Sequence, residues 1–235
     1  MDCLGKGNSL GRSVLMSGDH APKSDLPGSV HDPLVPPRKR SKTVPFYFPS
    51  FTLNPLSVKA FNEVFYRAHP SSQGKLVDYD TYFYPLDAIH HWNRIYGKVG
   101  FTQYQVTVPV DRIDGLVTIL ERLSAQGAAS FLAVLKRMGK GNEGLLTYPM
   151  DGYTLTLDIP MRKSLVPFLH ELDEILLNNG GRLYLAKDVC TKPETFAAMY
   201  PELDAFRHIK ERLDPDNKLS SRMARRLGLT PERTT

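Results

Sequence analysis

The fold is decided by the stretch GGRLYLAKD, residues 180–188, in which a short apolar segment follows a glycine pair. The glycines end the amphipathic helical pattern before them, and Arg182 to Ala186 then reads as a strand. Lys187 and Asp188 follow at the end of that strand, where side chains meet ligands. Asp188 can hold a neighbouring ammonium in its charged form, so Lys187 is a candidate functional residue. A solvated Lys-Asp pair at the protein surface is the alternative.

The strand at 182–186 completes a series of six regular elements. Before it, the sequence predicts strand 101–109, a helix that is capped by Asp111 and stopped by Gly127, strands 130–138 and 153–159, and helix 164–177. The first helix has one apolar stripe: Ile113, Leu116, Val117, Leu120 and Leu123. The order β-α-β-β-α-β predicts an α+β fold, a split β-α-β or ferredoxin-like domain with helices on one face of an antiparallel sheet.

One face of this sheet is expected to be polar. Strand alternation puts Gln103 and Gln105 on one side of the first strand, and Thr154 and Thr156, with Asp158, on one side of the third. We assign Lys136 to the same face, because a lysine is costly to bury against helices. Amides, hydroxyls and one cation suit a polyhydroxylated ligand or a heteroaromatic ring. The alternative is an ordinary solvated face.

The rest of the chain is less regular. Residues 1–20 have no start signal, and proline-rich residues 22–50, which include the basic run 38–40, are not expected to form a packed element. Further on, the sequence predicts a helix from Asn54-Pro55 to Pro70, a strand from Tyr79 to Leu86, a helical turn at 88–96, and helices at 193–199, 201–212 and 220–227.

Composition limits the classes of function. The 235 residues carry a net charge of +5 with pI about 9.1, which suits an anionic ligand or membrane face, but there is no nucleic-acid motif. Cys3 and Cys190 have no zinc-like spacing, so no metal is expected, and two free thiols in a reducing compartment are favoured over a single bridge.

No signal peptide or membrane span is predicted. We expect a soluble, cytoplasmic protein, with peripheral membrane contact as an alternative.

Several motifs carry a resemblance to a known family. They are YPLD at 84–87 with Trp92-Asn93, QYQ at 103–105, GGRLYLAKD at 180–188, MYP at 199–201, LDP at 213–215 and ARRL at 224–227. In this order they resemble the C-terminal half of the decaprenylphosphoryl-β-D-ribose 2-oxidase-like enzymes. These are FAD-linked oxidases of the vanillyl-alcohol oxidase superfamily, related to the D-arabinono-1,4-lactone oxidases.

The resemblance implies roles for the candidate residues. Tyr184 and Lys187 are expected to contact the flavin of FAD, and Lys187 is expected to be catalytic, near the sugar hydroxyl that is oxidised. Gln103, Gln105 and Lys136 are expected to bind substrate. Thr154 and Thr156 look to stand where mycobacterial enzymes have asparagine and cysteine, so they too are assigned to the substrate pocket.

The resemblance also implies a domain division. We expect residues 1–20 to be a remnant of the junction with an FAD domain, 21–53 a mobile loop, 54–181 the substrate domain, and 182–235 a helical tail that packs on the FAD domain. No dinucleotide fingerprint is present, so the FAD-binding domain is expected to be absent, and either a separate polypeptide or a gene whose start has been lost or misassigned is expected to supply it. The expected reaction is oxidation of a secondary hydroxyl of a lipid-linked pentose or aldonolactone by hydride transfer to flavin. A noncatalytic remnant that binds the sugar lipid, including a polyprenyl-phosphate sugar, is the alternative.

Overall fold

The computed structural model describes residues 1–30, 32–35, 41–71, 74–128, 130 and 132–231. The chain forms two compact units, one of Met1–Arg12 with Phe101–Thr235 and one of Ser13–Gly100. We call the first the sheet unit. The domains expected from the sequence were defined by their roles toward FAD and substrate. Two compact units do not test those roles, so that division stays a prediction.

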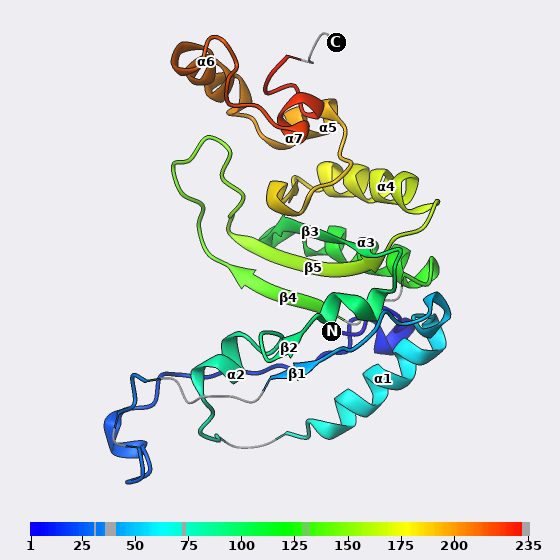
Figure 1. Cartoon of the computed structure of the whole chain (residues 1–235). Helices are drawn as coiled ribbons and strands as arrows, with labels where there is room; N and C mark the ends of the chain where they lie inside the picture. The colour runs from blue at the N-terminus through cyan, green and yellow to red at the C-terminus, as the bar shows by residue number, and fades with distance from the viewer. Residues whose placement is uncertain (31, 36–40, 72–73, 129, 131, 232–235) are drawn as a thin grey trace. The chain divides into compact units, whose positions relative to one another are not determined.

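The sheet unit contains four strands in the order β4-β5-β3-β6, and all neighbours are antiparallel. The strands are β3 (Phe101–Pro109), β4 (Ala133–Met138), β5 (Gly152–Pro160) and β6 (Arg182–Leu183). Helices α3 (Ile113–Ala125) and α4 (Leu165–Asn178) pack on each other and against β3 (Figure 1). Each helix joins two strands that have a third strand between them. This arrangement confirms the predicted α+β fold with two split β-α-β units.

The core lies between the sheet and these two helices. On β3, Tyr104, Val106 and Val108 alternate with the polar residues and are buried. Leucine and isoleucine side chains from β5 and the helices close the same layer: Leu155, Leu157, Ile159, Leu116, Ile119, Leu123, Leu165, Leu169, Leu172 and Leu176. Each fully buried side chain of this size contributes about 1.5–3 kcal/mol, so the sheet unit has its own core.

The start of α3 differs from the prediction. A 3-10 helix at Val110–Arg112 precedes it, and Arg112 is the N-cap residue without a side-chain hydrogen bond. The predicted cap at Asp111 is therefore wrong, because Asp111 lies inside that turn and not before the helix. The buried stripe is also rotated: Ile113 and Val117 are 36% and 39% exposed, whereas Ile119 is fully buried between Leu116 and Leu123.

Strand β6 is shorter than predicted. Arg182 and Leu183 pair with β3, and the backbone N–H of Tyr184 adds one more bond to the carbonyl of Gln105, at 2.9 Å. The chain then turns into a 3-10 helix, Leu185–Lys187, closed by the N–H of Lys187 donating to the carbonyl of Tyr184. Lys187 thus stands on a tight turn and not at the end of a strand.

Both ends of the sheet unit are packed onto it. The amino group of Met1 donates to the carbonyl of Ala133 at 2.9 Å, and Cys3 and Leu4 are buried. Among the described residues of 1–20, the regular element is a 3-10 helix at Gly7–Ser9. The C-terminal region contains α5 (Pro193–Met199), α6 (Leu203–Leu213) and α7 (Arg222–Arg226), as the sequence predicts.

The Ser13–Gly100 unit confirms one helix and corrects one expectation. Helix α1 (Pro55–Ala68) starts where the sequence predicts it, and Asn54 is its N-cap residue. The predicted strand at 79–86 is wrong: α2 (Tyr79–Phe83) forms there, because the Asp78 carboxylate accepts from the N–H of Thr81 and caps a helix.

Within residues 22–50 the structure has a two-residue strand with both residues exposed, which is a regular element but not a packed one. Strand β1 (Lys42–Thr43) pairs in parallel with β2 (Ile89–His90), and Arg94 donates to the carbonyl of Val44 at 2.9 Å. The predicted turn around Trp92 is a 3-10 helix, Trp92–Tyr96. The basic run 38–40 lies outside the described residues.

Two structural observations bear on the cysteines and on membrane spans. The thiols of Cys3 and Cys190 are both free, as expected. No described helix combines the length and the apolar composition that crossing a bilayer requires.

Candidate functional site

The strand register brings the predicted substrate residues onto one face of the sheet. Gln103 stands opposite Asp158 and Gln105 opposite Thr156 in the β3-β5 pair. Lys136 stands opposite Thr154 in the β4-β5 pair. Lys136 is exposed, Thr154 is buried and the two glutamines are half-buried, so this face has both a closed and an open part. Whether these residues bind substrate stays a prediction.

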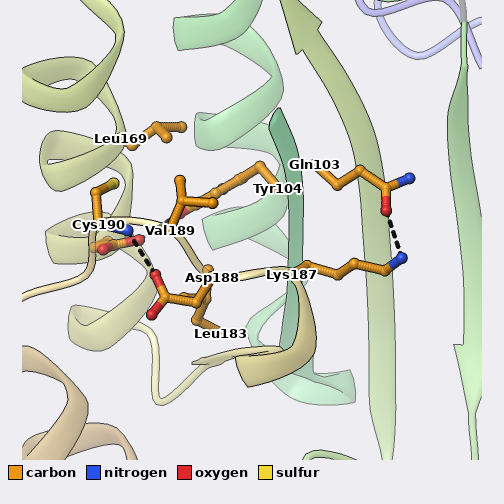
Figure 2. Close-up of a pocket in the computed structure, with 9 residues that line it drawn as sticks. Gln103, Tyr104, Leu169, Leu183, Lys187, Asp188, Val189 and Cys190 are labelled. Carbon is orange, nitrogen blue, oxygen red and sulfur yellow. Dashed lines mark hydrogen bonds between the residues drawn. The ribbon is translucent and has the colours of Figure 1, made fainter. Parts of the chain in front are cut away.

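Lys187 reaches this face from the turn after β6. Its Nζ donates to Oε1 of Gln103, as Figure 2 shows. The Nε2 of the same amide donates to Oδ1 of Asp158 at 2.8 Å. Lys187, Gln103 and Asp158 therefore form a hydrogen-bonded chain that runs from a half-buried ammonium to a fully buried carboxylate.

The hydrogen-bonding properties of Lys187 and Asp158 fix the orientation of the Gln103 amide that lies between them. An ammonium can only donate and a carboxylate can only accept, so the Gln103 side chain satisfies both in one orientation only. Its oxygen must face Lys187 and its NH₂ group must face Asp158. Sequence reasoning placed Asp158 on the polar face but gave it no role. An aspartate in the middle of a buried strand is the signal that could have marked it.

Tyr148 is a second residue that sequence reasoning missed. It belongs to the connection between β4 and β5, and its side chain is buried on the polar face. The hydroxyl lies 2.6 Å from Oγ1 of Thr154, which also accepts from Nε2 of Gln105 at 3.4 Å. Burial raises the pKa of Tyr148 to about 12, so the hydroxyl stays neutral. A lone tyrosine in a loop gives no periodic signal in the sequence.

Tyr184 lies against Tyr148, with ring centroids 4.6 Å apart. Both rings line a pocket of about 310 Å³ whose other lining residues are Asn142, Gly144, Leu146, Thr147, Pro149, Leu185 and Tyr200. The Oγ1 of Thr147 is buried there without a hydrogen-bond partner among the described residues. Aromatic walls suit a flat ligand that can stack on them.

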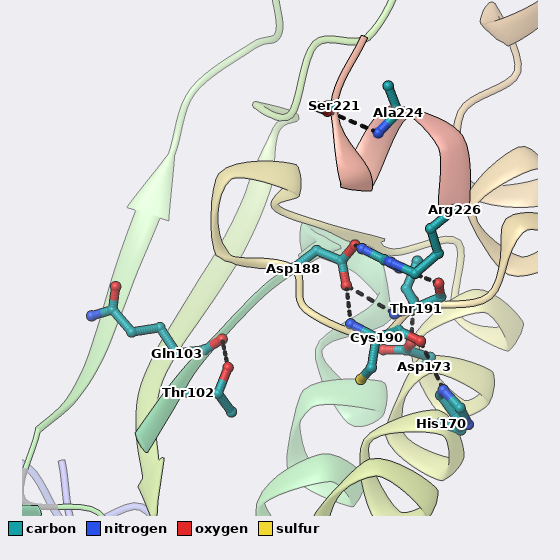
Figure 3. Close-up of polar contacts among 10 residues, drawn as sticks. All are labelled: Thr102, Gln103, His170, Asp173, Asp188, Cys190, Thr191, Ser221, Ala224 and Arg226. Carbon is teal, nitrogen blue, oxygen red and sulfur yellow. Dashed lines mark hydrogen bonds and ion pairs between the residues drawn. The ribbon is translucent and has the colours of Figure 1, made fainter. Parts of the chain in front are cut away.

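Asp188 points away from Lys187, although the two are neighbours in sequence. Its carboxylate pairs with Arg226 of α7 and accepts from the backbone N–H groups of Cys190 and Thr191 (Figure 3). The expected mutual interaction of Lys187 and Asp188 is therefore not the arrangement in the structure. Lys187 contacts the polar face of the sheet, whereas Asp188 holds the backbone of the turn that follows.

A buried polar cluster lies beside this turn. Asp173 of α4 accepts from the hydroxyl groups of Tyr104, at 2.8 Å, and Thr191. Burial raises the pKa of Asp173, and the two hydrogen bonds partly oppose that shift. Burial and the nearby Asp173 raise the pKa of Tyr104 well above its usual value. A cavity of about 10 Å³ between this cluster and Lys187 has room for about one water molecule.

The comparisons with known proteins give the family. Residues 99–227 match the profile of the D-arabinono-1,4-lactone oxidase family. The chain belongs to this family, which confirms the resemblance found in its motifs. The matched range contains the whole four-stranded sheet, the Lys187 turn and α7.

Two relatives extend the similarity to nearly the whole chain. A decaprenylphosphoryl-beta-D-ribose oxidase of Mycolicibacterium smegmatis is 37% identical over 229 residues, covering 97% of this chain and 50% of that protein. A Streptomyces coelicolor protein, described as uncharacterized and in the mprA 5' region, is 34% identical over 239 residues, covering 97% of this chain and 64% of that protein. The chain spans about half to two thirds of the length of these relatives.

Proposed function

We propose that this chain forms the substrate half of an FAD-dependent oxidoreductase that oxidises a secondary hydroxyl of a sugar, either a lipid-linked pentose or an aldonolactone. The observation that carries the proposal is the hydrogen-bonded chain of Lys187, Gln103 and Asp158 at the edge of a polar sheet face. The family membership and the mycobacterial relative support the reaction class.

Lys187 is the proposed catalytic residue. Its ammonium is held by one neutral acceptor, the Gln103 carbonyl oxygen, and retains further N–H donors for a substrate oxygen. A fixed positive charge near the reacting oxygen stabilises negative charge that develops there, and it is most effective where water is excluded. The half-buried position of Lys187 provides part of that exclusion.

The residues around Tyr184 fit a flavin. Tyr184 and Tyr148 offer ring surfaces against which a flat ring system can stack. When bound, FAD supplies the acceptor for the hydride that leaves the substrate carbon. We propose that its binding domain comes from another polypeptide segment or a separate chain, and that Tyr184 and Lys187 meet it from the substrate side.

The open part of the polar face is the proposed sugar site. Gln105 and Thr156 present an amide and a hydroxyl, which match the donors and acceptors of a sugar ring. The exposed ammonium of Lys136 lies one strand further out and suits the phosphate of a polyprenyl-phosphate sugar. A neutral aldonolactone would leave Lys136 without a function. A substrate with such a lipid would also bring peripheral membrane contact.

The test starts with the protein from its native source. We expect flavin absorption bands and, in the same sample, an intact mass that reveals any second polypeptide. Lys187→Ala should lower kcat by at least about 100-fold, in the range found when one charge-stabilising donor is removed. Lys163→Ala, at an exposed lysine outside the polar face, is the matched control. Unchanged turnover in Lys187→Ala would refute the catalytic assignment.

A noncatalytic sugar-binding module is the second candidate, because every residue of the proposed sugar site lies on this chain. It predicts a colourless protein that binds a polyprenyl-phosphate sugar without flavin. Titration calorimetry with the sugar lipid, with Lys136→Ala as the comparison, tests the sugar site that both candidates share, and the presence or absence of flavin absorption separates them. Failure to bind either ligand would exclude both.

A further inference from the structure

The turn that carries Lys187 is held from its far side by a residue almost forty positions later in the chain. Arg226 of α7 forms an ion pair with Oδ2 of Asp188, and its second terminal nitrogen donates to the carbonyl oxygen of Thr191. One guanidinium group thereby binds both the Asp188 side chain and the Thr191 carbonyl of the same turn (Figure 3). The planar fork of arginine can make both contacts, whereas an ammonium is a single point.

Asp188 connects the Arg226 side chain to the backbone of the turn. Its side chain is only 2% exposed, and Oδ1 accepts from the N–H groups of Cys190 at 3.0 Å and Thr191 at 2.9 Å. A side-chain oxygen that accepts from two following N–H groups sets the direction in which the chain leaves the turn. Loss of Arg226 would leave a buried carboxylate without its cation, and such groups are costly.

The opposite side of the turn is anchored as well. The Thr191 hydroxyl donates to Asp173 of α4, and His170 of the same helix donates to the carbonyl of Cys190 at 2.8 Å. The segment 188–191 is thus held between α4 and α7. Lys187 immediately precedes this segment, so the direction of its side chain follows from these contacts.

We propose that Arg226 is a positioning residue which, through Asp188, holds the turn so that Lys187 reaches Gln103. The functional importance of this contact rests on the role proposed for Lys187, but the positioning itself is measurable without turnover. The C-terminal helix then acts on the reacting groups through a chain of polar contacts within the sheet unit.

The first experiment uses amide hydrogen exchange and thiol alkylation in the full chain. Cys190 is part of the turn, and burial raises its pKa to about 11, whereas Cys3 is deep in the core. In Arg226→Gln, we expect the amides of Cys190 and Thr191 to exchange, and the Cys190 thiol to react, at least about tenfold faster. Arg222→Gln, which removes the same charge from an exposed site on α7, should change neither rate.

The second readout separates positioning from general stability. The side-chain NH₂ signals of Gln103 should shift in Arg226→Gln, while Cys3 stays protected. Combining Arg226→Gln with Asp188→Asn should add little to either single change, because the two residues act through one contact. Equal acceleration at Cys3 and Cys190 would make Arg226 a general stability residue and overturn the proposal. Unchanged exchange and an unchanged Gln103 signal would overturn it too.

These measurements do not depend on the proposed reaction. If Lys187→Ala leaves turnover intact but Arg226→Gln releases the turn, the function is refuted and the positioning stands. If Lys187→Ala abolishes turnover but Arg226→Gln leaves the turn and the Gln103 signal unchanged, the positioning is refuted alone.

Discussion

Replacing the carboxylate of Asp158 by an amide tests the hydrogen-bonded chain most directly. Asp158→Asn keeps the shape of the side chain, so it creates no cavity in the sheet. It adds a donor where only an acceptor stood. The NH₂ group of Gln103 no longer has a carboxylate to face, and its amide can turn so that a donor points at the Lys187 ammonium.

The size of the effect follows from the contacts. The Gln103 to Asp158 bond is 2.8 Å long, and the carboxylate is fully buried. A hydrogen bond to a charged group contributes about 1.5–3 kcal/mol. If that preference is lost, the ratio of the two amide orientations falls by about 10- to 150-fold, so the two become about equally populated. The population that holds Lys187 in place then falls about twofold, and we expect kcat to fall by a similar factor with little change in KM.

The assay has two parts. Nitrogen-15 spectra of the isolated chain follow the NH₂ group of Gln103, which is assigned by its disappearance in Gln103→Glu. Turnover is then measured in the FAD-loaded enzyme. Asp111→Asn, at an exposed position beyond the end of β3, is the matched control. If Asp158→Asn leaves both the Gln103 signals and kcat unchanged, the carboxylate does not orient the amide and the reasoning is wrong.

Three further predictions concern stability. Tyr148→Phe should lower the free energy of unfolding by about 0.5–1.5 kcal/mol in urea titrations, since it removes the bond to buried Thr154; no change would mean that this bond is not formed in solution. Asp173 has a raised pKa in the folded protein, so wild-type stability should fall as pH rises above 3.8 through that raised pKa; Asp173→Asn should remove this dependence, and an identical pH profile would contradict the assignment. Gly152→Ala should cost about 2–4 kcal/mol, because the new Cβ would lie 1.9 Å from the carbonyl oxygen of Val108, whereas Gly139→Ala, with open space around it, should be neutral; equal melting temperatures would refute this.

The sheet could be predicted because its signals are local and repeated. Nine residues of alternating character specify β3, and its predicted limits agree with the structure. The strand predicted at 79–86 failed for the opposite reason. Aromatic residues favour strands in general, but the Asp78 carboxylate accepts from the backbone N–H of Thr81 and so caps a helix of five residues.

The site residues also divide into those that local sequence signals could predict and those that they could not. Periodicity placed Gln103 and Gln105, and likewise Thr154 and Thr156, on one side of their strands, because a side chain's face depends on its position in a strand. Lys136 was added to that face because a lysine is costly to bury. It could not reveal that Lys187 and Asp188 point to different partners, since that depends on where β6 stops and the turn begins. The partner of Asp188 is Arg226, and no spacing rule links two positions that have the helices α5 and α6 between them. Lysine and aspartate at neighbouring positions therefore look like one functional pair, whereas in the folded chain the first contacts Gln103 on the polar face and the second holds the turn in place.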